Sequence, residues 1–228
     1  MNNLQKEKTV VLNFLKDIDN SPKENLQEVI SNHTSDDFKM LCTHPFNELS
    51  GSSDIANNLW APIKDSFTPV QRRLDIFYAG INSLNENNDV WISSMGHLMG
   101  VFNKEFFGLK PNYKSSLLRF AEFYKVKENK ITEGAFFLDI FNFMQQLGLS
   151  IIPKSTGLIC VTPGPMNHKG LKFELSDEKE SLQTLNLIHR MRDRLVKGSK
   201  MKSFKDELVL DWKEDMIWWG PGGIGASY

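Results

Sequence analysis

Three ionisable side chains lie in apolar stretches of the sequence, where each could transfer a proton. Asp139 lies in "EGAFFLDIFNFMQQLG", His97 in "SSMGHLMGVF" and Glu122 in "LLRFAEFYKV". Burial among apolar groups raises the pKa of a carboxyl group, and a histidine titrates near neutral pH, so such residues suit general acid–base chemistry. We predict that Asp139 and His97 are catalytic residues and that Glu122 binds a substrate.

Each of these residues also has a simpler interpretation. Asp139 could cap the helix that follows it by accepting a hydrogen bond from a backbone N–H group, a role that is compatible with catalysis. His97 could be an ordinary packing residue of a strand. Glu122 could form an ion pair with one of three arginines, Arg72, Arg73 or Arg119.

His44, Trp60 and Trp91 are further candidates for substrate-binding residues at the mouth of a pocket, although aromatic residues are more often part of a core. The sequence contains no H-x-x-x-H or H-x-H pattern, no G-x-S-x-G motif and no catalytic Cys–His arrangement. We therefore expect no metal site.

The composition is that of an ordinary globular protein: 228 residues, 24% charged, 40% hydrophobic, with a net charge of -1. Such a balance attracts neither nucleic acid nor an anionic membrane. Cys42 and Cys160 are widely separated and indicate reduced thiols. Because no apolar run approaches the ~20 residues of a membrane span, we expect a soluble, cytoplasmic protein.

Several helices must come first along the chain. Apolar residues at helical spacing predict a helix over 4–18, and Ser21, Pro22 and Glu24 predict a capping box that begins a second helix over about 22–31. A short strand around "DDFKML" should lead into a turn at Pro45. A further helix is expected to begin at Ser52 or Ser53 and to end near Pro62.

From Arg72 onward, apolar and polar residues alternate with a period of two, which predicts an antiparallel meander of three or four strands. The segments "LNENND" and "KENK" are the expected hairpin turns. A helix then follows Asp139 and ends at Gly148. Helices followed by consecutive strands indicate an α+β domain over 1–152, with helices on one face of the sheet and a pocket on the other.

A second, incomplete unit is predicted after a linker over 153–176. The order of elements at the start of the chain is repeated here: helices are predicted over 177–197 and 203–211, followed by the strand-like "IWW". Residues 177–228 are therefore predicted to be a partial second domain. We expect its apolar face to dock on the first domain or on a partner chain. The final G-x-G-x-x-G is not preceded by a βαβ unit, which argues against a dinucleotide site.

Two longer phrases, "MGHLMGVFNKEFFGLKPN" and "FYKVKENKITEGAFFLDIFNFMQQLGL", resemble segments of the SnoaL-like polyketide cyclases, within the nuclear transport factor 2-like superfamily. The resemblance covers about residues 5–150. It implies a cone-shaped α+β fold around a deep apolar pocket, no cofactor, and frequent dimerisation through the outer face of the sheet. "EDMIWWGPGGIGASY" resembles the start of the second domain in tandem members.

The resemblance also implies a chemistry. In the cyclases an aspartate of the closing segment is the acid or base of an intramolecular aldol closure, and the match places this role on Asp139. The cyclases have a polar group shortly before it, where this chain has "EGAFF". The leading prediction is a domain that binds an apolar small molecule, with cyclase-like, isomerase or hydrolase chemistry. The alternative is a non-catalytic binding or homodimerisation domain.

Overall fold

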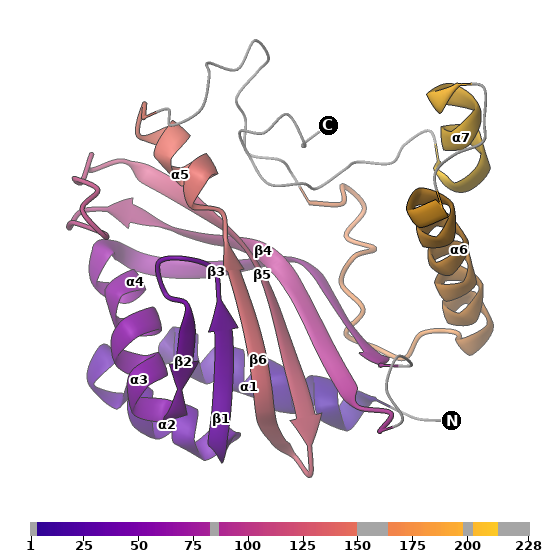
Figure 1. Ribbon diagram of the computed structural model, residues 1–228. Coiled ribbons are helices and arrows are strands. Elements are labelled where there is room, and N and C mark those ends of the chain that lie inside the picture. Colours follow the sequence, from indigo (N-terminus) through magenta and orange to yellow (C-terminus); the bar gives the residue numbers. More distant parts are fainter. Residues whose placement is uncertain (1–3, 83–86, 150–163, 198–202, 214–228) are drawn as a thin grey trace.

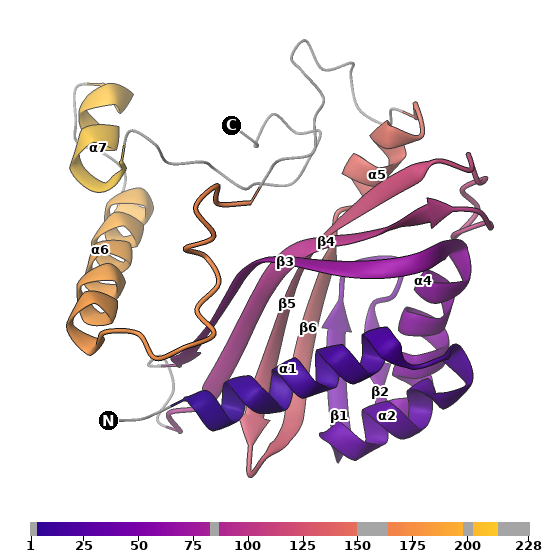
Figure 2. The same cartoon turned by 180° about the vertical axis from the view of Figure 1, so that it is seen from behind.

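A curved six-stranded sheet forms the centre of the molecule, and the N-terminal helices cover one of its faces (Figures 1 and 2). The structure is a computed structural model that describes residues 4–82, 87–149, 164–197 and 203–213. The α+β class predicted from the order of helices and strands is confirmed.

Three helical segments precede β1. α1 (Gln5–Asn20) buries one apolar stripe, and a 3-10 turn (Lys23–Asn25) leads into α2 (Leu26–His33). The predicted capping box is wrong. The backbone N–H of Ser21 donates to the carbonyl oxygen of Asp17, so Ser21 ends α1, and no side chain caps the 3-10 turn or α2.

The helical run after β2 is longer than the sequence indicated. α3 (Gly51–Ile55) continues through a π-helical turn (Ala56–Trp60) into α4 (Ala61–Ser66). The prediction that it ends near Pro62 is wrong, because Pro62 lies in the first turn of α4, where the missing N–H group costs little.

The sheet has the strand order β2-β1-β6-β5-β4-β3. Its strands are β1 (Thr34–Cys42), β2 (Glu48–Ser50), β3 (Phe67–Ile81), β4 (Val90–Phe102), β5 (Ser115–Lys127) and β6 (Lys130–Leu138). β3 to β6 form the predicted antiparallel meander, whereas β1 runs parallel to β6. Glu128 and Asn129, with φ of 51° and 63°, make the tight turn expected at "KENK".

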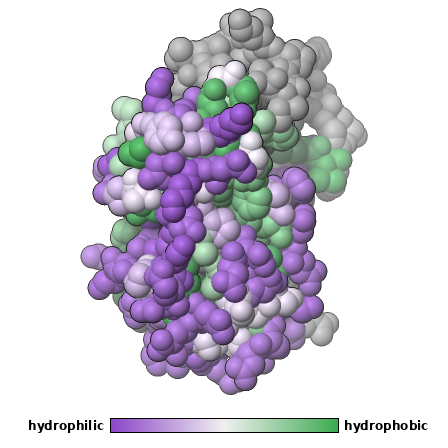
Figure 3. Space-filling model, turned by 90° about the vertical axis from the view of Figure 1, so that its left-hand side faces the viewer, coloured by the Kyte–Doolittle hydropathy of each residue, from purple (hydrophilic) through white to green (hydrophobic). Residues whose placement is uncertain are grey.

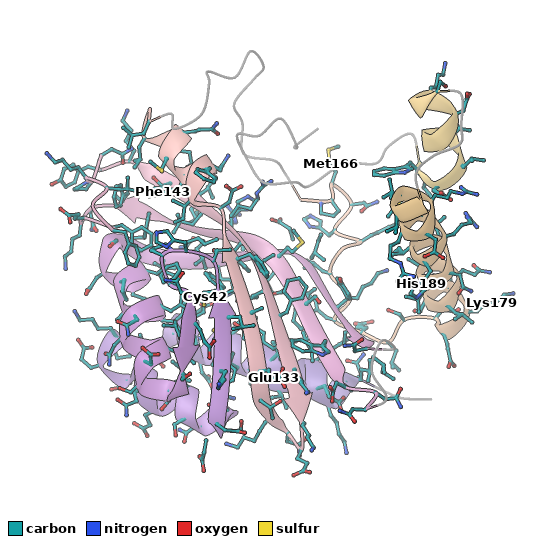
Figure 4. All side chains as sticks on the ribbon, in the orientation of Figure 1. Cys42, Glu133, Phe143, Met166, Lys179 and His189 are labelled. Atoms are coloured by element: carbon teal, nitrogen blue, oxygen red, sulfur yellow. The ribbon has the colours of Figure 1, made fainter. Side chains whose placement is uncertain are left out.

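The space between sheet and helices is an aromatic core. Trp60 contacts Phe136 edge-on, with ring centres 5.6 Å apart, and Phe143 of α5 (Ile140–Gln146) packs on Phe102 with ring centres 5.1 Å apart (Figure 4). Phe137 is on the opposite face of β6 and is 49% exposed. On the side that carries α3 and α4, most of the surface is hydrophilic and the hydrophobic residues gather in a narrower strip (Figure 3).

The C-terminal part adds two helices, α6 (Glu178–Lys197) and α7 (Phe204–Asp211), close to the predicted bounds. Part of the predicted linker pairs with the outer edge of β3. The backbone N–H of Phe77 donates to the carbonyl oxygen of Gly170 (2.8 Å), and the backbone N–H of Lys172 donates to the carbonyl oxygen of Phe77 (2.7 Å). Lys8 Nζ of α1 donates to the carbonyl oxygen of Lys172 (2.6 Å). The predicted strand of the second domain lies outside the described residues.

No helix in the described ranges has both the length and the apolar composition that crossing a membrane requires.

A bulge in β3 depends on one glycine. The register between β3 and β4 shifts between Leu74 and Ile76, and Gly96 lies opposite this point. A Cβ atom on Gly96 would overlap the carbonyl oxygen of Arg73. Such a bulge bends a strand and re-aims its side chains.

We predict that Gly96→Ala destabilises the fold by about 1–3 kcal/mol, because the β3 backbone must move to admit the methyl group. Gly80→Ala is the matched control, since a Cβ on Gly80 meets nothing within 4 Å. Urea unfolding measures both variants. Equal stabilities of the two would contradict the tight contact.

Candidate functional site

A buried carboxylate lies at the centre of the helix-covered face. Glu122 on β5 is 0% exposed, and its Oε1 accepts hydrogen bonds from Arg72 Nη1 (2.7 Å) and Ser94 Oγ (2.6 Å). Its Oε2 accepts from the hydroxyl of Tyr124 (2.9 Å). Ser94 faces Glu122 across the β4–β5 pair, so strand register places these groups together. Both carboxylate oxygens therefore have donors within the protein.

Arg72 connects this carboxylate to a second one. Its side chain on β3 is 4% exposed, and its Nε donates to both oxygens of Asp19 at the end of α1 (3.2 and 3.0 Å). Burial alone would lower the pKa of Arg72, but the charges of Glu122 and Asp19 raise it above its ordinary value. The guanidinium is thus a permanent cation between two carboxylates.

The same guanidinium lies over two aromatic rings. Its central carbon is 5.1 Å from the centre of the Trp60 indole and 5.0 Å from that of Phe120, distances that allow cation–π attraction. Two buried donors in this cluster, Arg72 Nη2 and Trp60 Nε1, have no hydrogen-bond partner among the described residues. Buried N–H groups are rarely left without an acceptor.

A cleft opens beside Arg72, between α1 and β3. Its volume is about 300 Å³. It is lined by Leu12, Leu15, Lys16, Asp19, Asn20, Arg72 and Leu74. The leucines and the lysine stem make most of its wall apolar, and Arg72 links it to the buried cluster.

Tyr124 keeps its proton at neutral pH. Burial, followed by the negative charge of Glu122, holds the pKa of its hydroxyl well above the ordinary value. Cys42 (Figure 4) also keeps its proton at neutral pH, because burial raises the pKa of its thiol to about 12. Neither group supplies an anion for nucleophilic attack near neutral pH.

Asp139 directly follows β6, and its carboxylate caps a helix and pairs with an arginine. Its Oδ1 accepts from the backbone N–H of Asn142 (3.0 Å), so it caps α5 as the simpler interpretation predicted. Its Oδ2 accepts from Arg119 Nη2 (2.8 Å) and Nε (3.2 Å). The cap and the ion pair fix the carboxylate at the end of the sheet.

His97 lies on the other face of the sheet from Glu122. It is directly opposite Arg119 in the β4–β5 pair, and its Nδ1 is 3.0 Å from Asp75 Oδ2. Burial lowers the pKa of His97, Asp75 opposes this change, and the cations Arg119 and Arg73 add to it. Asp75, His97, Arg119 and Asp139 therefore form a row on the face away from α1.

The six predicted site residues do not form one site. Glu122 and Trp60 belong to the buried cluster, whereas His97 and Trp91 alternate onto the opposite face of β4. His44 is exposed in the turn between β1 and β2. The ion pair of Glu122 with Arg72 was one of the predicted alternatives and is confirmed.

Sequence reasoning missed Asp19, Ser94 and Asp75. A polar residue inside an apolar strand, such as Ser94 in "VWISSMG", was a usable signal for a buried polar cluster. The pairing of Asp19 with Arg72 had no such signal, because the two residues are 53 positions apart. Within the described ranges, no group of three or more His, Cys, Asp or Glu side chains is placed to hold a metal ion.

We predict that Glu122→Gln lowers the free energy of unfolding by about 3 kcal/mol, because one charge of a buried pair loses its partner. Glu133→Gln is the control: Glu133 is 54% exposed and pairs with Lys125 at the surface (Figure 4), so its loss should cost at most about 1 kcal/mol. Chemical denaturation measures both. Similar costs for the two variants would show that Glu122 is not a buried charge.

We predict that His97 makes the fold less stable as the pH falls. The folded-state pKa of His97 is below its ordinary value, so between these two values the unfolded chain binds a proton that the folded chain does not. Stability is full above about pH 6.5 and declines on acidification through the folded pKa. His97→Asn should flatten this decline, whereas His44→Asn, at an exposed site, should not. Denaturation over a pH series tests this, and identical slopes in all three proteins would refute it.

The comparisons with known proteins concern the fold. No model of a known protein family matches the sequence, and no curated protein matches it. Among solved structures, IdmH, a candidate polyketide cyclase from Streptomyces antibioticus, is 11% identical with a TM-score of 0.49; the match covers 62% of this chain and 97% of IdmH.

Two further solved structures are similar. A candidate SnoaL-like polyketide cyclase from Jannaschia sp. CCS1 is 15% identical with a TM-score of 0.48, over 65% of this chain and 94% of the other. An NTF2-like protein from Burkholderia thailandensis E264 is 14% identical with a TM-score of 0.46, over 62% and 96%. These three structures are similar to this chain in fold, each with a TM-score below 0.5.

Proposed function

We propose that this chain is a SnoaL-like domain that binds a mostly apolar small molecule in the cleft between α1 and β3. The observation that carries the proposal is the pair of buried donors, Arg72 Nη2 and Trp60 Nε1, which have no acceptor among the described residues. A core that exists only for stability gains nothing from such groups, because each unsatisfied donor costs about 1–3 kcal/mol.

The body of the ligand is apolar in this proposal. Leu12, Leu15 and Leu74 line the cleft, and its volume of about 300 Å³ is at the lower end of the range for small-molecule sites. A bicyclic hydrocarbon skeleton fits this description. Arg72 at one wall supplies the polar contact that would orient such a molecule.

The polar group of the ligand is a neutral acceptor, such as a carbonyl oxygen. Arg72 already donates to Glu122 and Asp19, so its charge is balanced by two carboxylates. A third carboxylate would compete with these two for the same guanidinium, while the other cation of the lining, Lys16, is exposed to water. A carbonyl oxygen that reaches the cluster from the cleft would accept a hydrogen bond from Arg72 or Trp60 without adding a charge. In an enzyme these donors would also stabilise negative charge that develops on that oxygen.

Acid–base catalysis by Asp139 with His97 is the second candidate, in line with the cyclase-like, isomerase or hydrolase chemistry that the resemblance implies. Arg119 favours it, because this residue contacts Asp139 and lies opposite His97 on the same face of the sheet. Such a reaction would need its substrate on the side of the sheet away from α1.

A non-catalytic interaction domain is the remaining alternative. Leu41 and Phe137 are exposed on the outer face of the sheet, 59% and 49% respectively, which supports a homodimer through this face. We also propose a cytoplasmic protein, on the basis of its composition and its two widely spaced cysteines.

We predict that the chain binds 2-acetylnaphthalene about 2- to 10-fold more tightly than 2-ethylnaphthalene, because the ketone oxygen accepts one or two hydrogen bonds that the hydrocarbon cannot. The Trp60→Phe variant should lose this preference and still bind the hydrocarbon. Trp91→Phe, on the opposite face of the sheet, should keep it. Isothermal titration calorimetry measures all three proteins.

The outcomes of this titration separate the parts of the proposal. No saturable binding of either compound would refute a small-molecule site in the cleft. Equal binding of both compounds would leave an apolar cleft but refute the carbonyl anchor. Tighter binding of 2-naphthoate than of the ketone would refute the charge argument at Arg72.

A further inference from the structure

One face of α6 is apolar and exposed. Leu182, Leu185, Ile188 and Leu195 project from it at steps of three, three and seven residues, which places them on one side of a helix. Their exposed fractions are 57%, 44%, 49% and 56%. Single exposed leucines are ordinary, but four on one stripe make a surface that a partner would cover.

The neighbouring helix does not cover this stripe. α7 is held to α6 by Asp211, whose side chain is 2% exposed and contacts Arg190 Nε (2.9 Å) and Arg194 Nη1 (2.6 Å). These arginines project from a different side of α6 than the four aliphatic residues. In both ribbon views α6 and α7 stand beside the sheet, and segment 164–177 leads to them (Figures 1 and 2).

The charges of α6 are divided along its length. Asp177, Glu178 and Glu180 lie at its start, accompanied by a single cation, Lys179. The second half is basic: Arg192, three residues before Leu195, lies on the side of the stripe, and Arg190 and Arg194 lie on the other side with Asp211. Two such helices side by side in parallel would place like charges together, whereas an antiparallel pair would place each acidic start against a basic end.

We propose that the exposed stripe of α6 binds the same stripe of a second copy of this chain, with the two helices antiparallel around a two-fold axis. The pairing is self-complementary in hydrophobicity and in charge. Apolar residues meet along the middle, and opposite charges meet at both ends. This interface is distinct from the ligand cleft and from the outer face of the sheet. A single helix pair is small beside stable interfaces of roughly 1,200–2,000 Å², so the dimer dissociates at roughly micromolar concentrations.

Sedimentation equilibrium of the full chain over a range of concentrations tests the interface. The wild-type chain should form a concentration-dependent dimer, and Ile188→Glu should raise its dissociation constant about tenfold or more, because the new carboxylate would be buried in the apolar seam. Leu41→Glu, on the exposed face of the sheet, is the matched control and should leave the α6 contact intact. Circular dichroism verifies that both variants keep the helix content of the wild type.

The orientation is tested by reversing the acidic end with Glu178→Lys and Glu180→Lys together. In an antiparallel pair this puts cations against the basic end of the partner and weakens the dimer, most clearly at low salt. In a parallel pair acidic repulsion is only replaced by basic repulsion, so the dissociation constant stays unchanged. A monomer at all concentrations, or a dimer that Leu41→Glu dissociates and Ile188→Glu does not, would overturn the proposed interface. A dimer unaffected by the double reversal would overturn the antiparallel arrangement.

Discussion

The guanidinium of Arg72 is the group around which the helices and the sheet are arranged. It joins Glu122 of the sheet to Asp19 of α1 and lies over the rings of Trp60 and Phe120. A cation removed from water is tolerated only when such partners surround it. The contacts therefore specify how α1, the π-helical turn with Trp60 and strands β3 and β5 must meet. A shift of any one of them would leave a buried charge without its partner.

The same arrangement supports the proposed binding of a small molecule. Both oxygens of Glu122 accept hydrogen bonds from protein groups, whereas two donors of the cluster are not used by any described residue. The proposed ligand would therefore contribute an oxygen atom that accepts from these donors. Asp139 and His97, on the other side of the sheet, are instead bound to Arg119 and Asp75 and help to fix the sheet and α5.

The fold class and most elements could be predicted from periodicity, since the alternation from β3 to β6 is strong and the cap at Asp139 is a local signal. Glu122 could be singled out because a carboxylate on an apolar strand needs a partner, but three arginines were equally plausible by sequence. Strand register decides which of the three arginines can reach Glu122. Arg72 faces the helices, Arg73 alternates to the other face, and Arg119 is on β5 opposite His97. The bulge after Leu74 turns Asp75 toward His97, and no local pattern in the sequence predicts it.

The most direct measurement of the central claim follows the indole N–H of Trp60 in the ¹⁵N-labelled chain, with its signal assigned from the Trp60→Phe variant. We predict that 2-acetylnaphthalene shifts this signal saturably, at the concentrations at which the ketone binds, and leaves the signal of Trp91 unchanged. A ketone that binds without moving the Trp60 signal would contradict it, because the buried donors would then have no part in recognition.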